Sequence, residues 1–111
     1  MGDTNYIGSI VKILESPNQK LFNNNIPITK FRAQLPQVRN NAIVTLSFWG
    51  NLANDVANYY KINDYIIIEG YLSIRTKSLN NSIVQSSKKV EITVFKVYPF
   101  LLSLNNRETE S

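Results

Sequence analysis

Residues 46–72 read LSFWGNLANDVANYYKINDYIIIEGYL and carry the clearest structural signals in the chain. This stretch predicts the end of a strand, a short helix over residues 52–60 and a long strand over residues 65–77. Gly50 interrupts the first strand, and Asn51 is predicted to cap the helix because its side chain can accept a hydrogen bond from the first turn. The helix has one apolar stripe to bury, formed by residues at a spacing of four: Leu52, Val56 and Tyr60.

Together with the two strands on either side of this helix, the sequence predicts five strands in all. Residues 6–14 are rich in Ile and Val and end at a Ser-Pro-Asn turn. Apolar and polar residues alternate over residues 28–35 and 42–49, and the last strand covers residues 89–98. In residues 42–49, the side chains expected to face the core are Ala42, Val44, Leu46 and Phe48.

Two irregular features accompany these strands. Residues 18–27 contain an Asn cluster before a proline and are predicted to be a loop. Gly70 lies inside the strand at 65–77 and indicates a bulge or a sharp bend. The face that Gly70 shares is expected to be the core side, with Ile66, Ile68, Leu72 and Ile74.

Three strands, a short helix and two strands follow one another in the order of an oligonucleotide/oligosaccharide-binding (OB) barrel. The predicted fold is therefore all-β: a five-stranded OB-fold barrel with a short helix between strands 3 and 4. A length of 111 residues suits one domain. We expect a single OB-fold domain over residues 1–102 and a short polar C-terminal tail over 103–111. An open five-stranded sandwich is the structural alternative.

The composition argues against an enzyme. The chain has no Cys and no His, so it lacks a thiolate, an imidazole base and the usual ligands of zinc. Its carboxylates are scattered, without a spacing that prepares acid–base chemistry or a magnesium site. We expect no catalytic residue, no metal, no cofactor and no small-molecule substrate. The longest apolar stretch, Tyr65 to Ile68, is far too short for a membrane span.

A formal net charge of +4 and a pI near 9.4 favour an anionic partner. In a barrel, the outward positions of strands 2 to 4 combine cations and aromatics with small polar groups such as Ser47, and with one carboxylate, Glu69. Cations neutralise phosphates, and aromatic faces stack unpaired bases. The candidate nucleic-acid-binding residues, including two lysines that flank this face, are Lys30, Arg32, Trp49, Tyr71, Arg75, Lys77, Lys88 and Lys89.

Other roles stay open for these residues. Trp49 can seal the rim of the barrel, and Tyr71 can pack against a second subunit. Arg75 and Lys77 near a strand end, like Lys88 and Lys89 after a polar loop, can be ordinary solvated charges. The grouping on one face is therefore more informative than any single member.

Residues 46–72 resemble the central block of the bacterial single-stranded DNA-binding protein family. An aromatic-Gly-Asn-Leu-Ala run opens the helix at Trp49, a Tyr-Lys turn follows it, and an apolar run leads into Glu69-Gly70-Tyr71-Leu72. The resemblance extends over residues 5 to about 100. It is strongest to a short plastid and cyanobacterial branch, in which a loop like Leu35-Pro36-Gln37 precedes the Trp-Gly-Asn-Leu-Ala segment. Ile43 stands where the main family usually has a stacking Trp.

The resemblance implies single-stranded DNA binding without sequence specificity, in plastid DNA replication or maintenance, by a homo-oligomer that is a dimer or a tetramer. A plastid origin also suits the composition, because Asn (15), Ile (13) and Lys (8) have AT-rich codons while Arg is rare at 4. The cytoplasm of a cyanobacterium is the alternative location. The alternative functions are an OB-fold protein-interaction subunit of a replication assembly and single-stranded RNA binding.

Overall fold

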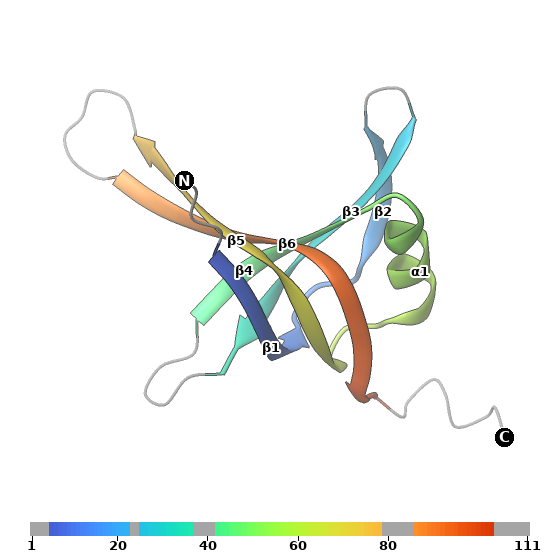
Figure 1. Cartoon of the computed structure of the whole chain (residues 1–111). Helices are drawn as coiled ribbons and strands as arrows, with labels where there is room; N and C mark the ends of the chain where they lie inside the picture. The colour runs from blue at the N-terminus through green and yellow to red at the C-terminus, as the bar shows by residue number, and fades with distance from the viewer. Residues whose placement is uncertain (1–4, 23–24, 37–41, 79–85, 104–111) are drawn as a thin grey trace, which may run out of the picture.

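A computed structural model describes residues 5–22, 25–36, 42–78 and 86–103 of the chain. Within these ranges there are six strands and one helix (Figure 1): β1 (Asn5–Ile13), β2 (Asn18–Phe22), β3 (Ile26–Leu35), β4 (Ala42–Trp49), α1 (Asn51–Tyr59), β5 (Tyr65–Ser78) and β6 (Ser86–Leu101). No helix in the described part of the chain is long and apolar enough to cross a membrane.

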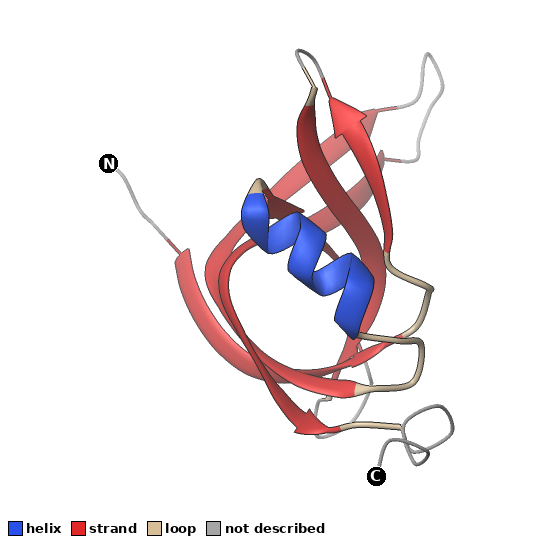
Figure 2. Ribbon diagram, turned by 90° about the vertical axis from the view of Figure 1, so that its right-hand side faces the viewer, coloured by secondary structure: helices blue, strands red, loops and turns tan. Residues whose placement is uncertain are grey.

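Five of the strands close into a ring. The sheet order is β1-β5-β6-β4-β3-β2, and β1 also pairs with β3, so the ring runs β1-β5-β6-β4-β3 and returns to β1. Only β4 and β6 pair in parallel among the described strands. Figure 2 shows α1 lying across one opening of this ring. The predicted all-β OB-fold with a short helix between the third and fourth barrel strands is confirmed.

The prediction of a loop over residues 18–27 is wrong. Residues 18–22 form β2, which pairs with residues 26–30 of β3 in a hairpin outside the ring. Asn25, in the connection, has a positive φ of 63°, a conformation that Asn tolerates better than most residues. The strand escaped the sequence pattern because Asn-Gln-Lys-Leu-Phe contains no β-branched residue.

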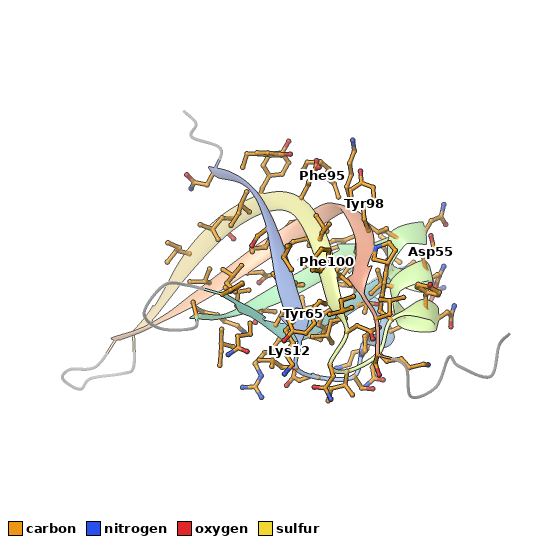
Figure 3. The ribbon with its side chains drawn as sticks, turned by 90° about the horizontal axis from the view of Figure 1, so that it is seen from below. Lys12, Asp55, Tyr65, Phe95, Tyr98 and Phe100 are labelled. Carbon is orange, nitrogen blue, oxygen red and sulfur yellow. The ribbon has the colours of Figure 1, made fainter. Side chains whose placement is uncertain are left out.

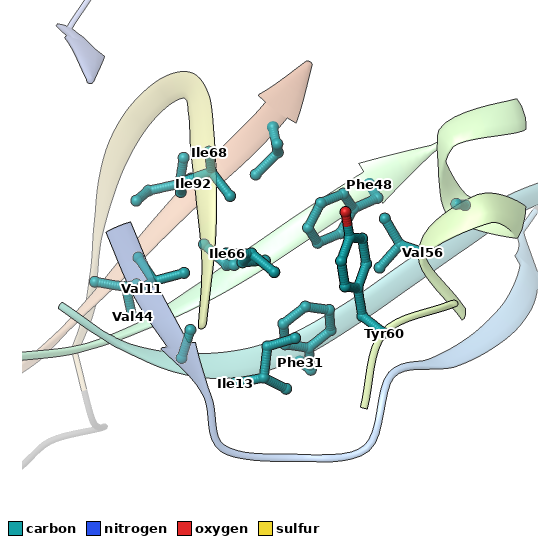
Figure 4. Close-up of a cluster of buried hydrophobic side chains, with 14 residues drawn as sticks. Val11, Ile13, Phe31, Val44, Phe48, Val56, Tyr60, Ile66, Ile68 and Ile92 are labelled. Atoms are coloured by element: carbon teal, nitrogen blue, oxygen red, sulfur yellow. The ribbon is translucent and has the colours of Figure 1, made fainter. Parts of the chain in front are cut away.

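The core fills the ring and reaches the helix (Figure 4). The rings of Phe31 and Phe48 stack with centroids 5.4 Å apart, and Val56 of α1 is fully buried beside them. The predicted core face of β4 is confirmed at Val44, Leu46 and Phe48. Ile74, by contrast, is 56% exposed, because β5 and β6 continue there as a two-stranded arm beyond their neighbours β1 and β4.

Gly50, which precedes α1, and Gly70, which lies within β5, are each favoured for a different structural reason. The predicted irregularity at Gly70 is confirmed: the register of β5 with β6 shifts between Glu69 and Gly70, which leaves Phe95 as the extra residue. Gly50, not Asn51, is the N-cap of α1, and no side-chain hydrogen bond caps the helix. Gly50 has a φ of 67°, which a glycine adopts without the strain of a side chain.

The end of β6 is tied to the turn that follows the helix. Asp64 is fully buried, and its carboxylate accepts hydrogen bonds from the N–H groups of Lys61 (2.8 Å) and Ser103 (2.7 Å). Asn63 in this turn has a φ of 75°, a left-handed conformation that Asn tolerates better than most residues. Of the predicted tail at 103–111, only Ser103 lies inside the described residues.

Candidate nucleic-acid interface

One row of residues crosses the outside of the barrel. The strand registers place opposite one another, in order across the ring, Lys30, Ser47, Thr93, Tyr71 and Tyr6. Residues directly opposite in paired strands point to the same face of a sheet. The residues that alternate with them, such as Phe31 and Leu46, are buried in the core. Lys30 and Tyr71 therefore share the outer face, as the sequence predicts.

Trp49 lies beside this row, at the end of β4. It is 40% exposed, so its indole is not part of the barrel interior. It lines a groove of about 780 Å³, which we call the Trp49 groove. The groove is lined by Glu15, Ser16, Asn18, Lys20, Leu21, Ile28, Lys30, Trp49, Glu91 and Thr93. The β2–β3 hairpin thus forms one side of the groove and β6 contributes to another.

Ser47 departs from the expectation of an exposed polar group. It lies on the outer face by register but is fully buried, and its hydroxyl has no hydrogen-bond partner within the described residues. It is therefore unavailable as a contact for a ligand. The sequence pattern fixes which side of a strand a residue occupies, whereas burial depends on what the neighbouring side chains cover.

Two of the predicted cations are held in ion pairs. The Lys30 ammonium lies 3.6 Å from the Glu91 carboxylate. The Arg32 guanidinium donates a 2.8 Å hydrogen bond to Glu15, and the Arg32 backbone N–H donates another of 2.8 Å to the same carboxylate. These hydrogen bonds, with the backbone donor as the larger cause, lower the pKa of Glu15 below its usual value. Sequence reasoning placed Glu69 as the one carboxylate on this face and missed the other two.

Tyr71 belongs to an exposed aromatic cluster. Its ring centroid lies 6.1 Å from that of Tyr6 and 5.1 Å from that of Phe95. The Tyr6 hydroxyl donates a 2.8 Å hydrogen bond to Glu69, which favours the protonated phenol and raises the pKa of Tyr6. Figure 3 shows Phe95 projecting away from the barrel. Tyr6 and Phe95 could have been found from the alternation of their strands, since Phe95 lies two residues after Thr93 and follows the buried Val94.

The remaining predicted cations lie on the two-stranded arm. The register pairs Arg75 with Lys89 and Thr76 with Lys88, and Lys77 follows in β5. Lys89 is exposed. The side chains of Arg75, Lys77 and Lys88 lie outside what the structure describes. By register, Arg75, Lys77 and Lys89 occupy positions on the outer face at one end of it, whereas Lys88, opposite Thr76, occupies a position on the other face.

Comparison with known proteins identifies the family. No protein-family model matches the chain. A protein of Trieres chinensis, named "Putative single-stranded DNA-binding protein ycf41", is 44% identical over 102 residues, which cover 88% of this chain and 90% of that protein. The chain belongs to the ycf41 family. The predicted resemblance to single-stranded DNA-binding proteins is thereby confirmed.

Solved structures agree with the fold of this ycf41 protein. The single-stranded DNA-binding domain of a Synechococcus sp. protein superposes with a TM-score of 0.69 at 22% identity, covering 88% of this chain and 98% of the other. The small single-stranded DNA-binding protein of Streptomyces coelicolor gives a TM-score of 0.75 at 17% identity, covering 90% and 97%. Membership in a family named for binding, not for a reaction, confirms the prediction of a non-enzyme.

Proposed function

We propose that this ycf41 protein binds single-stranded DNA without sequence specificity, by stacking bases on aromatic side chains and holding phosphates with Lys and Arg. The observation that carries the proposal is the exposed indole of Trp49 in a groove that also contains Lys20 and Lys30. An exposed aromatic ring beside cations is what single-stranded nucleic acid requires, because every base has a face to stack and every nucleotide carries a charge. The name of the Trieres chinensis relative supports the choice of DNA.

The path of the strand follows the outer row. A base stacked on Trp49 lies in the groove that Thr93 also lines, and Thr93 is directly opposite Tyr71 in β5. The next platform along this path is therefore the Tyr71 ring, which is 46% exposed. Stacking on such a platform contributes roughly 1–3 kcal/mol per base.

Phosphates are held along the edges of this path. The side chains of Lys30 and Arg32 remain 48% and 60% exposed despite their ion pairs, so both keep N–H donors facing solvent. Lys89 extends the basic edge along the arm, and the strand positions of Arg75 and Lys77 make them further candidates, while Lys88 lies at a position on the opposite face. Attraction by these cations makes the affinity fall as salt rises.

We also propose that the protein assembles as a homo-oligomer. The outer face of β1, β5 and β6 carries a second apolar row in addition to the aromatic cluster, with Ile10 opposite Ile67 and Ile67 opposite Tyr98. Tyr98 is exposed and projects outward (Figure 3). An exposed apolar patch of this kind is typical of a surface that another protein covers. The same patch favours, as a second candidate function, an OB-fold subunit that binds a protein partner.

The site of action that we propose is the plastid, in the replication or maintenance of its DNA. The support is compositional: the abundance of Asn, Ile and Lys and the scarcity of Arg suit an AT-rich genome of the organellar kind. Immunolocalisation in the source organism tests this location, and a signal outside the plastid contradicts it.

The binding proposal is tested with oligo-dT at several salt concentrations. Because Trp49 is the one tryptophan of the chain, its fluorescence reports the groove directly, and we expect quenching with a steep negative salt dependence. Trp49→Ala, followed by the anisotropy of a labelled oligonucleotide, should weaken binding by about 1–3 kcal/mol.

The matched control is Ile62→Ala, which removes a similarly exposed apolar side chain from the turn after the helix and should leave the affinity unchanged. Absence of binding at low salt would contradict the proposal. Tighter binding of the corresponding ribo-oligonucleotide would replace DNA by RNA as the ligand.

A further inference from the structure

The Trp49 groove contains carboxylates as well as lysines, and this limits what can enter it. Its described lining residues include two lysines, Lys20 and Lys30, and two glutamates, Glu15 and Glu91. Glu91 lies 3.6 Å from the Lys30 ammonium, and Glu15 is paired with Arg32. A phosphate gains little net attraction in such a place, because the carboxylates repel it as the lysines attract it. A neutral planar base that stacks on the indole is not repelled by the carboxylates in this way. If the protein binds single-stranded DNA as proposed, the groove is a site for a base, and the phosphates lie along its edges.

Glu91 is the unusual member of this lining. Its side chain is only 9% exposed, although it lies on the outer face that is proposed to meet a polyanion. Burying a carboxylate costs free energy unless hydrogen bonds or an opposite charge compensate for it. Lys30, 3.6 Å away, supplies the charge. Together the two groups place a hydrogen-bond acceptor next to a hydrogen-bond donor on the wall of the groove.

The bases differ in how well they fit this pair. Cytosine, adenine and guanine each carry an exocyclic amine next to an acceptor atom, so one base can donate to a carboxylate and accept from an ammonium group. Thymine has no amine. The one N–H group on its base-pairing edge lies between two carbonyl oxygens. A carboxylate that accepts a hydrogen bond from this N–H is therefore repelled by the oxygens on either side. A buried carboxylate therefore discriminates against thymine.

We propose that Glu91, with Lys30, is a base-selecting pair beside the Trp49 stacking platform, and that it favours bases with an exocyclic amine over thymine. The rest of the path remains tolerant of sequence, since stacking and phosphate contacts do not read base identity. The inference rests on the proposed DNA binding and adds to it a bias in base composition at one subsite.

Oligo-dC and oligo-dT of equal length provide the decisive comparison, because both are pyrimidine strands of equal charge. Their dissociation constants are measured by anisotropy at pH 7.5 and one salt concentration. We expect the unmodified protein to bind oligo-dC about fivefold or more tightly than oligo-dT. Equal affinities, or tighter binding of oligo-dT, overturn the inference and leave the binding proposal intact. No binding of either strand overturns the binding proposal itself.

Two variants separate base selection from simple charge. Glu91→Gln removes the charge and provides both a donor and an acceptor, so the ratio of the two affinities should fall towards one as thymine becomes acceptable. Glu15→Gln removes the same charge from the same groove and should tighten both complexes equally, with an unchanged ratio. If both variants changed the ratio of the oligo-dC and oligo-dT affinities by a similar amount, the preference would come from charge alone, and the inference would be overturned. The ratio in the unmodified protein needs no variant and decides the matter even if Glu91→Gln does not fold.

Discussion

The backbone of Gly70 lies so close to the carbonyl oxygen of Thr93 that no side chain fits between them. A Cβ atom on Gly70 would overlap that oxygen and lie 2.9 Å from Cγ2 of Ile92. Gly70→Ala should therefore force β5 and β6 apart at the centre of the ring and lower the free energy of unfolding by about 1–3 kcal/mol. Urea denaturation measures this change.

Gly8→Ala is the matched control for that measurement. A Cβ atom on Gly8 would lie 3.8 Å from the nearest backbone atom, the carbonyl oxygen of Ile68, which is an ordinary contact. Its effect on the free energy of unfolding should stay within about 0.5 kcal/mol. Equal effects of the two substitutions would contradict the close approach at Gly70.

The ion pair of Glu15 and Arg32 predicts a pH-dependent contribution to stability. The pKa of Glu15 lies below its usual value of 4.5 because the folded chain stabilises the ionised carboxylate. The contribution is therefore complete above the unfolded-state pKa and is lost as the pH falls through the lower, folded-state pKa. Glu15→Gln should cost about 0.5–1 kcal/mol at pH 7, because the exposed pair is screened by water, and nothing at pH values below the folded-state pKa. Denaturation at a series of pH values checks this.

Arg32→Gln tests the cause of that pKa shift. This variant removes the guanidinium group but keeps the backbone N–H, which is the larger cause of the lowered pKa of Glu15. It should retain part of the pH dependence that Glu15→Gln abolishes. If Arg32→Gln removes all of the dependence, the backbone hydrogen bond is not the main cause.

Tyr71→Ala distinguishes a base platform from a subunit contact. We expect binding of oligo-dT to weaken by about 1–3 kcal/mol, because one stacking face is lost. The molecular mass in solution, measured by light scattering, should not change. Tyr98→Ala should show the opposite pattern, with a lower assembly mass. A lower mass for Tyr71→Ala with unchanged binding per subunit would assign this ring to the interface.

Lys89→Gln probes the basic edge on the arm. Each phosphate contact of a single strand contributes roughly 0.7 to the slope of log affinity against log salt, so this variant should make the slope shallower by about that amount. Lys61→Gln removes an equal charge from the turn after the helix, outside the proposed path, and should leave the slope unchanged. Equal slopes for Lys89→Gln and the unmodified protein would exclude Lys89 from the phosphate contacts.

Much of the fold could be predicted because its signals are local. The alternation of β4, the apolar stripe of α1 and the glycine of β5 lie within short windows of sequence, and the order of the elements indicates the barrel. The hairpin strand β2 could not be seen, because its pairing with β3 depends on an Asn-containing connection and not on hydrophobic alternation. Ile74 was assigned to the core because the pattern continues after the barrel ends.

The candidate site was less accessible to sequence reasoning because its chemistry depends on residues far apart in the chain. The position of Trp49 and Tyr71 on the outer face follows from the alternation of side chains between the two faces of each strand. The approach of Glu91 to Lys30 follows only from the order of strands around the ring, in which β4 separates β3 from β6. A face that the composition presents as basic therefore also carries carboxylates where its one tryptophan lies.

The place of β6 in the ring has a consequence for synthesis. β6 follows all the other described strands in the sequence and lies between β4 and β5, so a nascent chain that has released only its first 85 residues lacks a central strand. Both flanking strands then expose unpaired backbone edges, which invite association with other chains. Local hairpins such as β2–β3 can form earlier, but the barrel closes only after translation has passed residue 101. Slow translation of the final segment should therefore increase the demand for chaperones.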